Sequence, residues 1–340
     1  MIFFRVDAND EIAFGHVMRS LSLADAFRAA GESVRLIAAD NNAREVIEER
    51  GFALDVLGTD WHNLDNEVDS VRELLIGAGQ PLVVVDTYCI TRSYVESLSD
   101  VARVCYLGSK PGYLGPLTAL VNYSTDIDEP TYHSLYEHEG TKLLLGPAYA
   151  PLRSEFQDRD VCLRREVKHC LVTTGSTDPK NMVGALLESG LRDPRLSALV
   201  FDVVVGPRFA YHDVLLERFG DNRRVTLHEG VKSMSALMNA CDAALSANGT
   251  TVYELAAMGL PAVTFAMVEE QEASAMTLAS LGAFRYAGLS YYNREAVTEA
   301  AIGHLAALVA DFDARETLAR TAHRLIDGNG CARIVHELLS

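Results

Sequence analysis

A histidine lies where an open α/β protein would place a catalytic base. Residues 2–7 form a strand-like run, residues 17–30 form a helix-like run, and Gly15-His16 lies at the junction between them. Open α/β sheets bind ligands at such junctions, outside the carboxyl ends of their strands. Imidazole can exchange a proton near neutral pH, and a glycine lets a ligand approach the backbone. His16 is therefore a candidate catalytic or ligand-orienting residue. The alternative is an exposed histidine in the first turn of a helix.

A carboxylate and an aromatic ring follow another strand candidate of the first half. Residues 82–85 are apolar throughout, as in a strand covered on both faces, and Asp86-Thr-Tyr88 comes directly after them. Asp86 could orient a substrate hydroxyl or the imidazole of His16, and Tyr88 could pack against a sugar ring. A turn carboxylate and a half-buried aromatic residue would account for the same pattern.

Two polar turns in the second half have the composition of phosphate sites. Each follows an apolar run and leads into a helix, so that backbone N–H groups and the helix dipole favour an anion. In the first turn Asp178 is a candidate N-cap, and Pro179 would take the first helical position. A well-capped helix without a ligand explains that turn equally well. The candidate phosphate ligands in the two turns are Gly175, Ser176, Thr177, Ser246, Asn248, Gly249, Thr250 and Thr251.

A glutamate one helical turn beyond the second polar turn points to a ribose. Glu254 falls on the same helix face as Thr250 or Thr251. A carboxylate can accept hydrogen bonds from both ribose hydroxyls, each worth about 1.5–3 kcal/mol because the acceptor is charged. We favour this role over the alternative, a first-turn acid that complements the helix dipole. Gln271 follows the next strand candidate and could line the same cleft, or simply begin a helix.

The charge balance limits the class of partner. The chain of 340 residues has a formal net charge of -17, with 49% apolar and 23% charged residues. Such a composition is typical of a globular protein, and the length suits two domains. The charge argues against nucleic-acid partners and against docking on an anionic membrane. Small anionic ligands remain compatible, because local dipoles can hold them. A monomer is also compatible, since the sequence does not determine the oligomeric state.

The cysteines and the first residues favour a cytoplasmic protein. None of the six cysteines has C-x-x-C spacing, so we expect neither a disulfide framework nor a zinc site. No other metal or cofactor is predicted. Charges at Arg5 and Asp7 argue against a signal peptide. No run of about 18 residues is free of charges or turn signals, so we expect no membrane span.

Strand-like and helical runs alternate along both halves, which is typical of doubly wound parallel sheets. We expect two Rossmann-like domains facing across a cleft, at residues 1–150 and 151–340. The passage between them is rich in proline and charged residues, and the chain ends in a helical tail broken at 327–330. The strand candidates are 2–6, 33–38, 53–57, 81–85, 103–107, 120–122, 142–145, 170–174, 199–205, 224–228, 243–246 and 262–266. The helix candidates are 17–30, 42–50, 65–79, 92–98, 180–189, 211–218, 233–240, 251–258, 271–281 and the tail from 294.

Several blocks, taken in order, resemble one enzyme family. The first are Arg5-x-Asp7, Phe14-Gly-His-Val-Met-Arg-Ser-Leu-Ser-Leu-Ala24 and Asp86-Thr-Tyr88. The others are Gly146-Pro-x-Tyr-Ala-x-Leu-Arg-x-Glu-Phe156, Gly175-Ser-Thr-Asp-x-x-Asn181, the helix start at 246–261 and Asp327-Gly-Asn-Gly-x-x-Arg333. Over nearly the whole chain the sequence resembles the UDP-2,4-diacetamido-2,4,6-trideoxy-β-L-altropyranose hydrolases of pseudaminic acid biosynthesis.

The resemblance implies a fold of the glycosyltransferase B type, similar to the peptidoglycan N-acetylglucosaminyltransferase. It implies a nucleotide in the C-terminal half and a sugar facing the N-terminal loop. It also implies a metal-independent, inverting attack of water on the anomeric carbon, which releases UDP and a free sugar. His16 matches the family histidine proposed as the base, and donors at Thr250 and Thr251 would stabilise the leaving diphosphate. Further substrate or UDP contacts are implied for Asp7, Gly15, Arg19 and Asn181.

Three positions depart from the family pattern near the expected sugar. The chain has Leu107-Gly-Ser-Lys110 in place of an acidic pair, Glu270 before Gln271, and Asn122-Tyr123 in place of Asn-Pro. These departures leave the nucleotide prediction unchanged and leave the identity of the sugar open. A glycosyltransferase of the same architecture, and a sugar-nucleotide binding protein without turnover, are the alternative functions.

Overall fold

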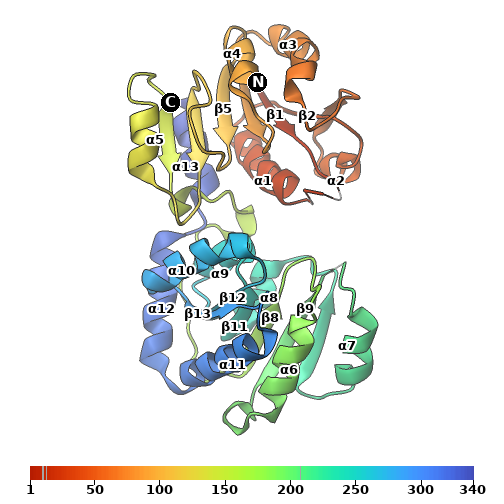
Figure 1. Ribbon diagram of the computed structural model, residues 1–340, viewed down its shortest axis with the longest axis vertical. Helices are drawn as coiled ribbons and strands as arrows, with labels where there is room; N and C mark the ends of the chain where they lie inside the picture. Colours follow the sequence, from red (N-terminus) through yellow and green to blue (C-terminus); the bar gives the residue numbers. More distant parts are fainter. Residues whose placement is uncertain (10, 13, 207) are drawn as a thin grey trace. The chain divides into compact units, whose positions relative to one another are not determined.

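The computed structural model describes residues 1–9, 11–12, 14–206 and 208–340. The chain divides into two compact units. Unit 1 comprises Met1–Ser154 and Asn329–Ser340, and unit 2 comprises Glu155–Gly328. Each unit is built on one parallel sheet with helices around it (Figure 1), so the prediction of two doubly wound α/β sheets is confirmed. In the ranges described, no helix is both long and apolar enough to cross a membrane.

The sheet of unit 1 has seven strands in the order β3-β2-β1-β4-β5-β6-β7, and neighbouring strands are parallel. The order reverses between β1 and β4, which creates the crevice where doubly wound sheets bind ligands. Val6 pairs with Asp86 across this crevice. The strands are β1 (Ile2–Val6), β2 (Val34–Ala38), β3 (Ala53–Val56), β4 (Leu82–Asp86), β5 (Arg103–Leu107), β6 (Ala119–Asn122) and β7 (Lys142–Leu145).

Helices cover both faces of this sheet. The neighbouring residues Phe3 and Phe4 point into two different apolar clusters, because side chains alternate along a strand. In the first helix Val17, Leu21 and Phe27 are fully buried. The helices are α1 (Gly15–Ala29), α2 (Arg44–Glu49), α3 (Val68–Ile76), α4 (Arg92–Ser99), α5 (Glu129–Leu135) and α13 (Gly330–Leu339), with 3-10 turns at Leu64–Glu67, Pro147–Tyr149 and Ser154–Phe156.

The sheet of unit 2 repeats this plan with six strands in the order β10-β9-β8-β11-β12-β13. Its reversal lies between β8 and β11, so the two polar turns of the second half follow the two strands of the crevice. The strands are β8 (His169–Thr173), β9 (Val200–Val205), β10 (Val225–Glu229), β11 (Ala243–Ala247), β12 (Ala262–Ala266) and β13 (Arg285–Leu289). The helices are α6 (Met182–Arg192), α7 (His212–Phe219), α8 (Met234–Ala240), α9 (Thr251–Ala257), α10 (Glu272–Ser280), α11 (Arg294–Ala310) and α12 (Phe312–Leu325), with 3-10 turns at Pro194–Leu196 and Glu269–Gln271.

The last helix does not belong with the second half. The predicted domain 151–340 assigned the whole tail to that half, whereas α13 is part of unit 1 and packs against α1. Cys331, Ile334 and Leu338 are almost fully buried in the unit 1 core. Their spacing makes one apolar face, but this spacing alone cannot say which core the face covers.

Two elements were absent from the predicted set. Helix α5 contains Pro130 in its first turn, a position where proline is tolerated. In the sequence this proline favoured the prediction of a loop. Strand β13 is half-buried and contains Gly288, so it lacks the apolar run that marked the other strands.

Candidate active site

His16 and Asp86 meet at the strand-order reversal of unit 1. His16 lies in the first turn of α1, directly after the loop that follows β1, and Asp86 ends the neighbouring strand β4. The imidazole Nδ1 is 2.5 Å from the carboxylate Oδ1. His16 is 4% exposed and Asp86 is 1% exposed. The low exposure of His16 excludes the alternative of an exposed histidine. The contact between Nδ1 and Oδ1 favours Asp86 as the group that orients His16.

Three further donors hold the Asp86 carboxylate. Arg19 donates from Nε to Oδ2 at 2.8 Å and from Nη2 to Oδ1, and the Ser20 hydroxyl donates to Oδ2 at 2.8 Å. Burial would raise the pKa of Asp86, but the charge of Arg19 and the hydrogen bonds from Arg19 and His16 outweigh it and lower that pKa. Asp86 is therefore an ionised carboxylate at neutral pH.

Arg19 is held in turn by its surroundings. Burial would lower the pKa of Arg19, yet the Asp86 carboxylate raises it well above its usual value. Arg19 Nη1 also donates to the Tyr123 hydroxyl at 2.9 Å. Ser20 and Tyr123 were not predicted as site residues. Ser20 could have been predicted, because positions 16, 19 and 20 share one helix face. The contact of Tyr123 with Arg19 could not, because it depends on the order of the strands in the sheet.

The geometry determines which ring nitrogen of His16 can accept a proton. Arg19 Nη2, which can only donate, lies 3.1 Å from Nδ1, but the shorter contact of 2.5 Å joins Nδ1 to an ionised carboxylate, which only accepts, and therefore favours Nδ1 as the donor to Asp86. The lone pair then lies on Nε2, which is buried and has no hydrogen-bond partner among the described residues. The ring of Tyr88 meets the His16 ring edge-on, with 4.5 Å between centroids, and Tyr88 is 59% exposed rather than half-buried. A reactant that loses a proton beside Nε2 would therefore find a base already oriented.

Asp7 lies in a separate buried network. Its Oδ2 accepts from Arg5, and its Oδ1 accepts from the Ala39 backbone N–H at 2.7 Å. Arg5 also donates to both oxygens of Glu67, at 2.5 and 2.8 Å. Because both oxygens of Asp7 are engaged inside the protein, the geometry favours a role in holding the ends of β1 and β2. Gly15, in contrast, begins α1, and a Cβ at this position would meet open space.

In unit 2 the turn after β8 differs from the prediction at its helix start. Helix α6 begins at Met182, so Pro179 is not the first helical residue. Asp178 still caps the helix from further upstream, because its oxygens accept from the N–H groups of Met182 and Val183, both at 2.8 Å. This reach requires the left-handed conformation of Asn181, whose φ is 51°. Gly175, with φ 86°, needs the same region.

A glycine at the end of β9 brings the neighbouring chain close to this turn. A Cβ at Gly206 would lie 2.5–2.6 Å from the backbone of Gly175 and Ser176. Ser176 and Thr177 are exposed at the tip of the turn. Gly206 was not among the predicted site residues, since only the packing of β9 beside β8 shows its role.

The turn between β11 and α9 is partly engaged within the protein. The Ser246 side chain is fully buried and donates to the Ala247 carbonyl at 2.9 Å, so it does not reach a ligand. Asn248 donates to the Gln271 carbonyl at 3.3 Å, and Gln271 Oε1 accepts from the Met267 N–H at 2.9 Å.

The start of α9 uses some of its own backbone donors: the N–H groups of Val252 and Tyr253 donate to the carbonyls of Gly249 and Thr250. The N-cap residue, the exposed Thr250, makes no side-chain cap hydrogen bond, and the half-buried Thr251 begins the helix. Glu254 belongs to the same first turn and is half-buried. The structure therefore brings the predicted phosphate and ribose residues of α9 onto one short segment at the carboxyl end of β11.

Unsatisfied buried polar atoms concentrate at predicted site positions. Seven such side-chain atoms occur among the described residues, and three of them are His16 Nε2, Asn181 Oδ1 and Asn248 Oδ1. A fourth is Thr174 Oγ1, directly before Gly175. Because buried polar groups are almost always paired in native proteins, the unpaired atoms at the two crevices are candidate contacts for a ligand or for water.

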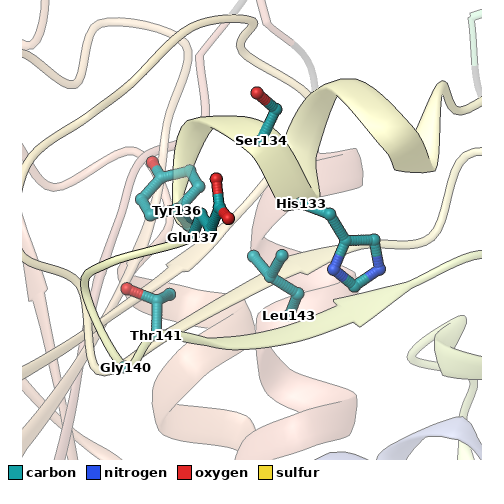
Figure 2. A pocket seen from close by; sticks show the side chains of 7 residues that line it. All are labelled: His133, Ser134, Tyr136, Glu137, Gly140, Thr141 and Leu143. Atoms are coloured by element: carbon teal, nitrogen blue, oxygen red, sulfur yellow. The ribbon is translucent and has the colours of Figure 1, made fainter.

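A groove elsewhere in unit 1 contains none of the predicted residues. It lies between α5 and β7, has a volume of about 610 Å³ and is shown in Figure 2. The residues that line it are His133, Ser134, Tyr136, Glu137, Gly140, Thr141 and Leu143. Within the described ranges, no group of three or more His, Cys, Asp or Glu side chains is arranged to hold a metal ion. All six cysteines are free thiols.

Comparison with known proteins gives distant relatives. No protein-family model matches the chain. The uncharacterized protein MJ1062 of Methanocaldococcus jannaschii is 25% identical over 277 residues, which cover 78% of this chain and 55% of that protein. The spore coat polysaccharide biosynthesis protein SpsG of Bacillus subtilis is 27% identical over 202 residues, which cover 59% of each chain. The matches thus span little more than half the length of either relative.

Solved structures match over nearly the whole chain. MurG of Acinetobacter baumannii has a TM-score of 0.65 at 13% identity and 98% coverage of both chains. The UDP-GlcNAc 2-epimerase of Neisseria meningitidis bound to UDP-GlcNAc has a TM-score of 0.66 at 12% identity, with both chains fully covered. The spinosyn rhamnosyltransferase SpnG complexed with thymidine diphosphate has a TM-score of 0.60 at 16% identity and also full coverage. The fold is that of the glycosyltransferase B type, which confirms the predicted fold class.

Proposed function

We propose that this protein binds a UDP-sugar and hydrolyses it at the anomeric carbon, with His16 as the general base. The observation that carries the proposal is the buried Nε2 of His16, which has no partner in the described part of the chain and whose Nδ1 contacts an ionised carboxylate. The proposed substrate is an acetamido, deoxy sugar linked to UDP, and the free sugar would serve the synthesis of a pseudaminic-type nonulosonic acid. This choice of sugar is supported by the ordered blocks from Arg5 to Arg333.

The proposed reaction needs one base and a stabilised leaving group. The oxygen of water attacks the anomeric carbon, its proton passes to His16 Nε2, and the sugar–oxygen bond breaks with its electron pair leaving on UDP. Attack opposite the leaving group inverts the anomeric configuration. The Asp86 carboxylate stabilises the imidazolium that forms, as the acid does in a Ser-His-Asp triad. A base of this kind contributes about 10²–10⁴-fold to the rate.

Unit 2 would hold the nucleotide. The segment at Thr250 and Thr251, where α9 begins, and the turn after β8 would bind the diphosphate through backbone N–H groups and hydroxyls. Glu254, in the first turn of α9, would accept from the ribose hydroxyls. A diphosphate bound by backbone donors can leave without a metal ion, because the donors are already in place for the developing charge.

The proposal is tested by incubating the purified protein with a panel of UDP-sugars and no acceptor, and following the anomeric proton by NMR. The expected result is release of UDP and of a free sugar whose first-formed anomer is inverted. The variant His16→Ala is assayed beside the wild type. Its matched control is His133→Ala, which removes an exposed histidine of the same unit. Absence of UDP release with every sugar, both alone and with acceptors, would favour a binding protein without turnover.

A glycosyltransferase is the second candidate. The observation that favours it is the match to SpsG, a protein named for polysaccharide biosynthesis. In that case His16 would deprotonate an acceptor hydroxyl instead of water. UDP would then appear only after an acceptor sugar or lipid is added to the same mixtures, and the hydrolase proposal would be wrong.

A further inference from the structure

The loop after β5 brings Lys110 against the loop that follows β4, the strand that ends at Asp86. Val85 pairs with Tyr106, so the last residue of β5 is level with Asp86 on β4. Tyr106 folds back over the loop, and its hydroxyl accepts from the Lys110 backbone N–H at 3.1 Å. A Cβ at Gly108 would lie 2.4 Å from that hydroxyl, so only glycine allows this arrangement. The loop therefore has one defined path past the end of β4.

The Lys110 ammonium group has one hydrogen-bond partner among the residues that the structure describes. Its Nζ donates to the Ile90 carbonyl, at 2.5 Å, on the loop that follows β4. The side chain is half-buried, and no acidic residue within the described ranges forms an ion pair with it. An ammonium group carries three N–H donors, so the Ile90 carbonyl leaves two of them for another acceptor.

The neighbouring cation is in the opposite situation. Arg19 is neutralised by Asp86, so this pair adds almost no net charge to the crevice. The chain as a whole carries 47 acidic against 30 basic side chains. A half-buried ammonium carries a desolvation cost, and within the described ranges the Ile90 carbonyl offsets it with one neutral hydrogen bond and no counter-charge. A ligand that carries a negative charge would offset it.

We propose that Lys110 binds an anionic oxygen of the nucleotide sugar, either a carboxylate on the sugar or an oxygen of the diphosphate. This inference rests on the proposed function, because it takes a UDP-sugar as the ligand of the crevice in unit 1. A contact with the diphosphate is compatible with the neutral acetamido, deoxy sugar proposed above, whereas a contact with a carboxylate would replace that sugar by an acidic one. The site would favour a substrate with an anionic group at the position that Lys110 reaches.

The two sources of negative charge are separated by equilibrium binding to matched pairs. UDP-glucuronate and UDP-glucose differ by one carboxylate, as do UDP-galacturonate and UDP-galactose, and UDP alone reports the diphosphate. Each is titrated calorimetrically into the wild type, Lys110→Met and Lys110→Arg. Lys142→Met is the matched control. Lys142 begins β7, at the amino ends of the strands of the same sheet, and its replacement changes the net charge by the same amount.

If a carboxylate is the ligand, the wild type binds at least one uronate about tenfold more tightly than its neutral partner. Lys110→Met then abolishes that preference and leaves UDP affinity unchanged, while Lys110→Arg retains part of it. If the diphosphate is the ligand, Lys110→Met weakens every compound by a similar factor. That loss must then become smaller as salt is raised, since the lost contact is ionic.

Two outcomes overturn the inference. Equal affinities of Lys110→Met and wild type for all five compounds would show that Lys110 contacts none of them. A uniform loss that is independent of salt and accompanied by a lower melting temperature would show that Lys110 only ties the two loops together. Failure of the wild type to bind UDP at all would instead refute the proposed function, which is a distinguishable result.

Discussion

Replacing Asp86 by asparagine should affect stability and catalysis through two different partners. The substitution keeps the shape of the side chain and removes its charge. Arg19, which donates two hydrogen bonds to this carboxylate, is then left as a largely buried cation without a counter-charge. Removing one partner of a buried ion pair costs about 3–5 kcal/mol of folding free energy. We expect a loss in that range, measured by urea unfolding.

The effect of the same substitution on turnover comes from His16. An asparagine amide can present its N–H₂ group to Nδ1, which would move the ring proton to Nε2 and remove the base. We expect UDP release to fall by about 10²–10⁴-fold, the usual contribution of a general base. The affinity for UDP should not change, because the residues proposed to bind the nucleotide lie in unit 2.

A double variant separates the two effects. Arg19→Met combined with Asp86→Asn removes both charges, so most of the lost stability should return. Turnover should stay low, because Nδ1 still lacks its carboxylate. The reasoning is refuted if Asp86→Asn alone releases UDP at the wild-type rate, or if the double variant regains both stability and turnover.

Acid unfolding tests the charge state of the same carboxylate. The pKa of Asp86 in the folded protein lies below its ordinary value of 3.8. A carboxylate of this kind contributes its full stability above the unfolded pKa and loses it as the pH falls towards the folded pKa. Below about pH 4 the free energy of unfolding should therefore fall more steeply for the wild type than for Asp86→Asn.

Three other predictions concern separate parts of the chain. Glu254→Ala should weaken UDP binding more than it slows saturated turnover, and equal UDP affinity in mutant and wild type would refute the ribose assignment. Arg5→Met leaves two buried carboxylates without their cation and should cost about 3–5 kcal/mol in urea unfolding; a loss below 1 kcal/mol would contradict that account. The ring centroids of Trp61, the only tryptophan, and His62 are 3.9 Å apart. The hydrogen bond with the Asp60 carboxylate raises the pKa of His62 above 6.5. Trp61 fluorescence should titrate with a midpoint above 6.5, Asp60→Asn should lower that midpoint, and an unchanged midpoint would show that Asp60 is not the cause.

The fold was predictable because its elements carry strong local signals. Leu82–Asp86 is a buried parallel strand with an uninterrupted apolar run, and α1 shows an apolar face at helical spacing. Helix α13 shows the limit of such signals. Its apolar face was visible, but only tertiary packing decides that it covers the core of unit 1.

The candidate site was predictable at strand ends and less so around them. His16 and Asp86 are 70 residues apart, and the order of the strands brings them together. Ser246 had the right chemistry and position, yet its hydroxyl turns inward to a backbone carbonyl. Tyr123 was marked as a departure near the expected sugar, but its contact with Arg19 was not predicted, because that contact joins α1 to the residue that follows β6. Side-chain direction and strand order are the two quantities that residue patterns did not supply.

The central claim is that His16 accepts the proton of the attacking group, and one comparison tests it most directly. UDP release and UDP affinity are measured in parallel for the wild type and His16→Ala, with a substrate found in the UDP-sugar panel. The account predicts that saturated turnover falls by about 10²–10⁴-fold while UDP affinity is unchanged. Wild-type turnover in His16→Ala would contradict it.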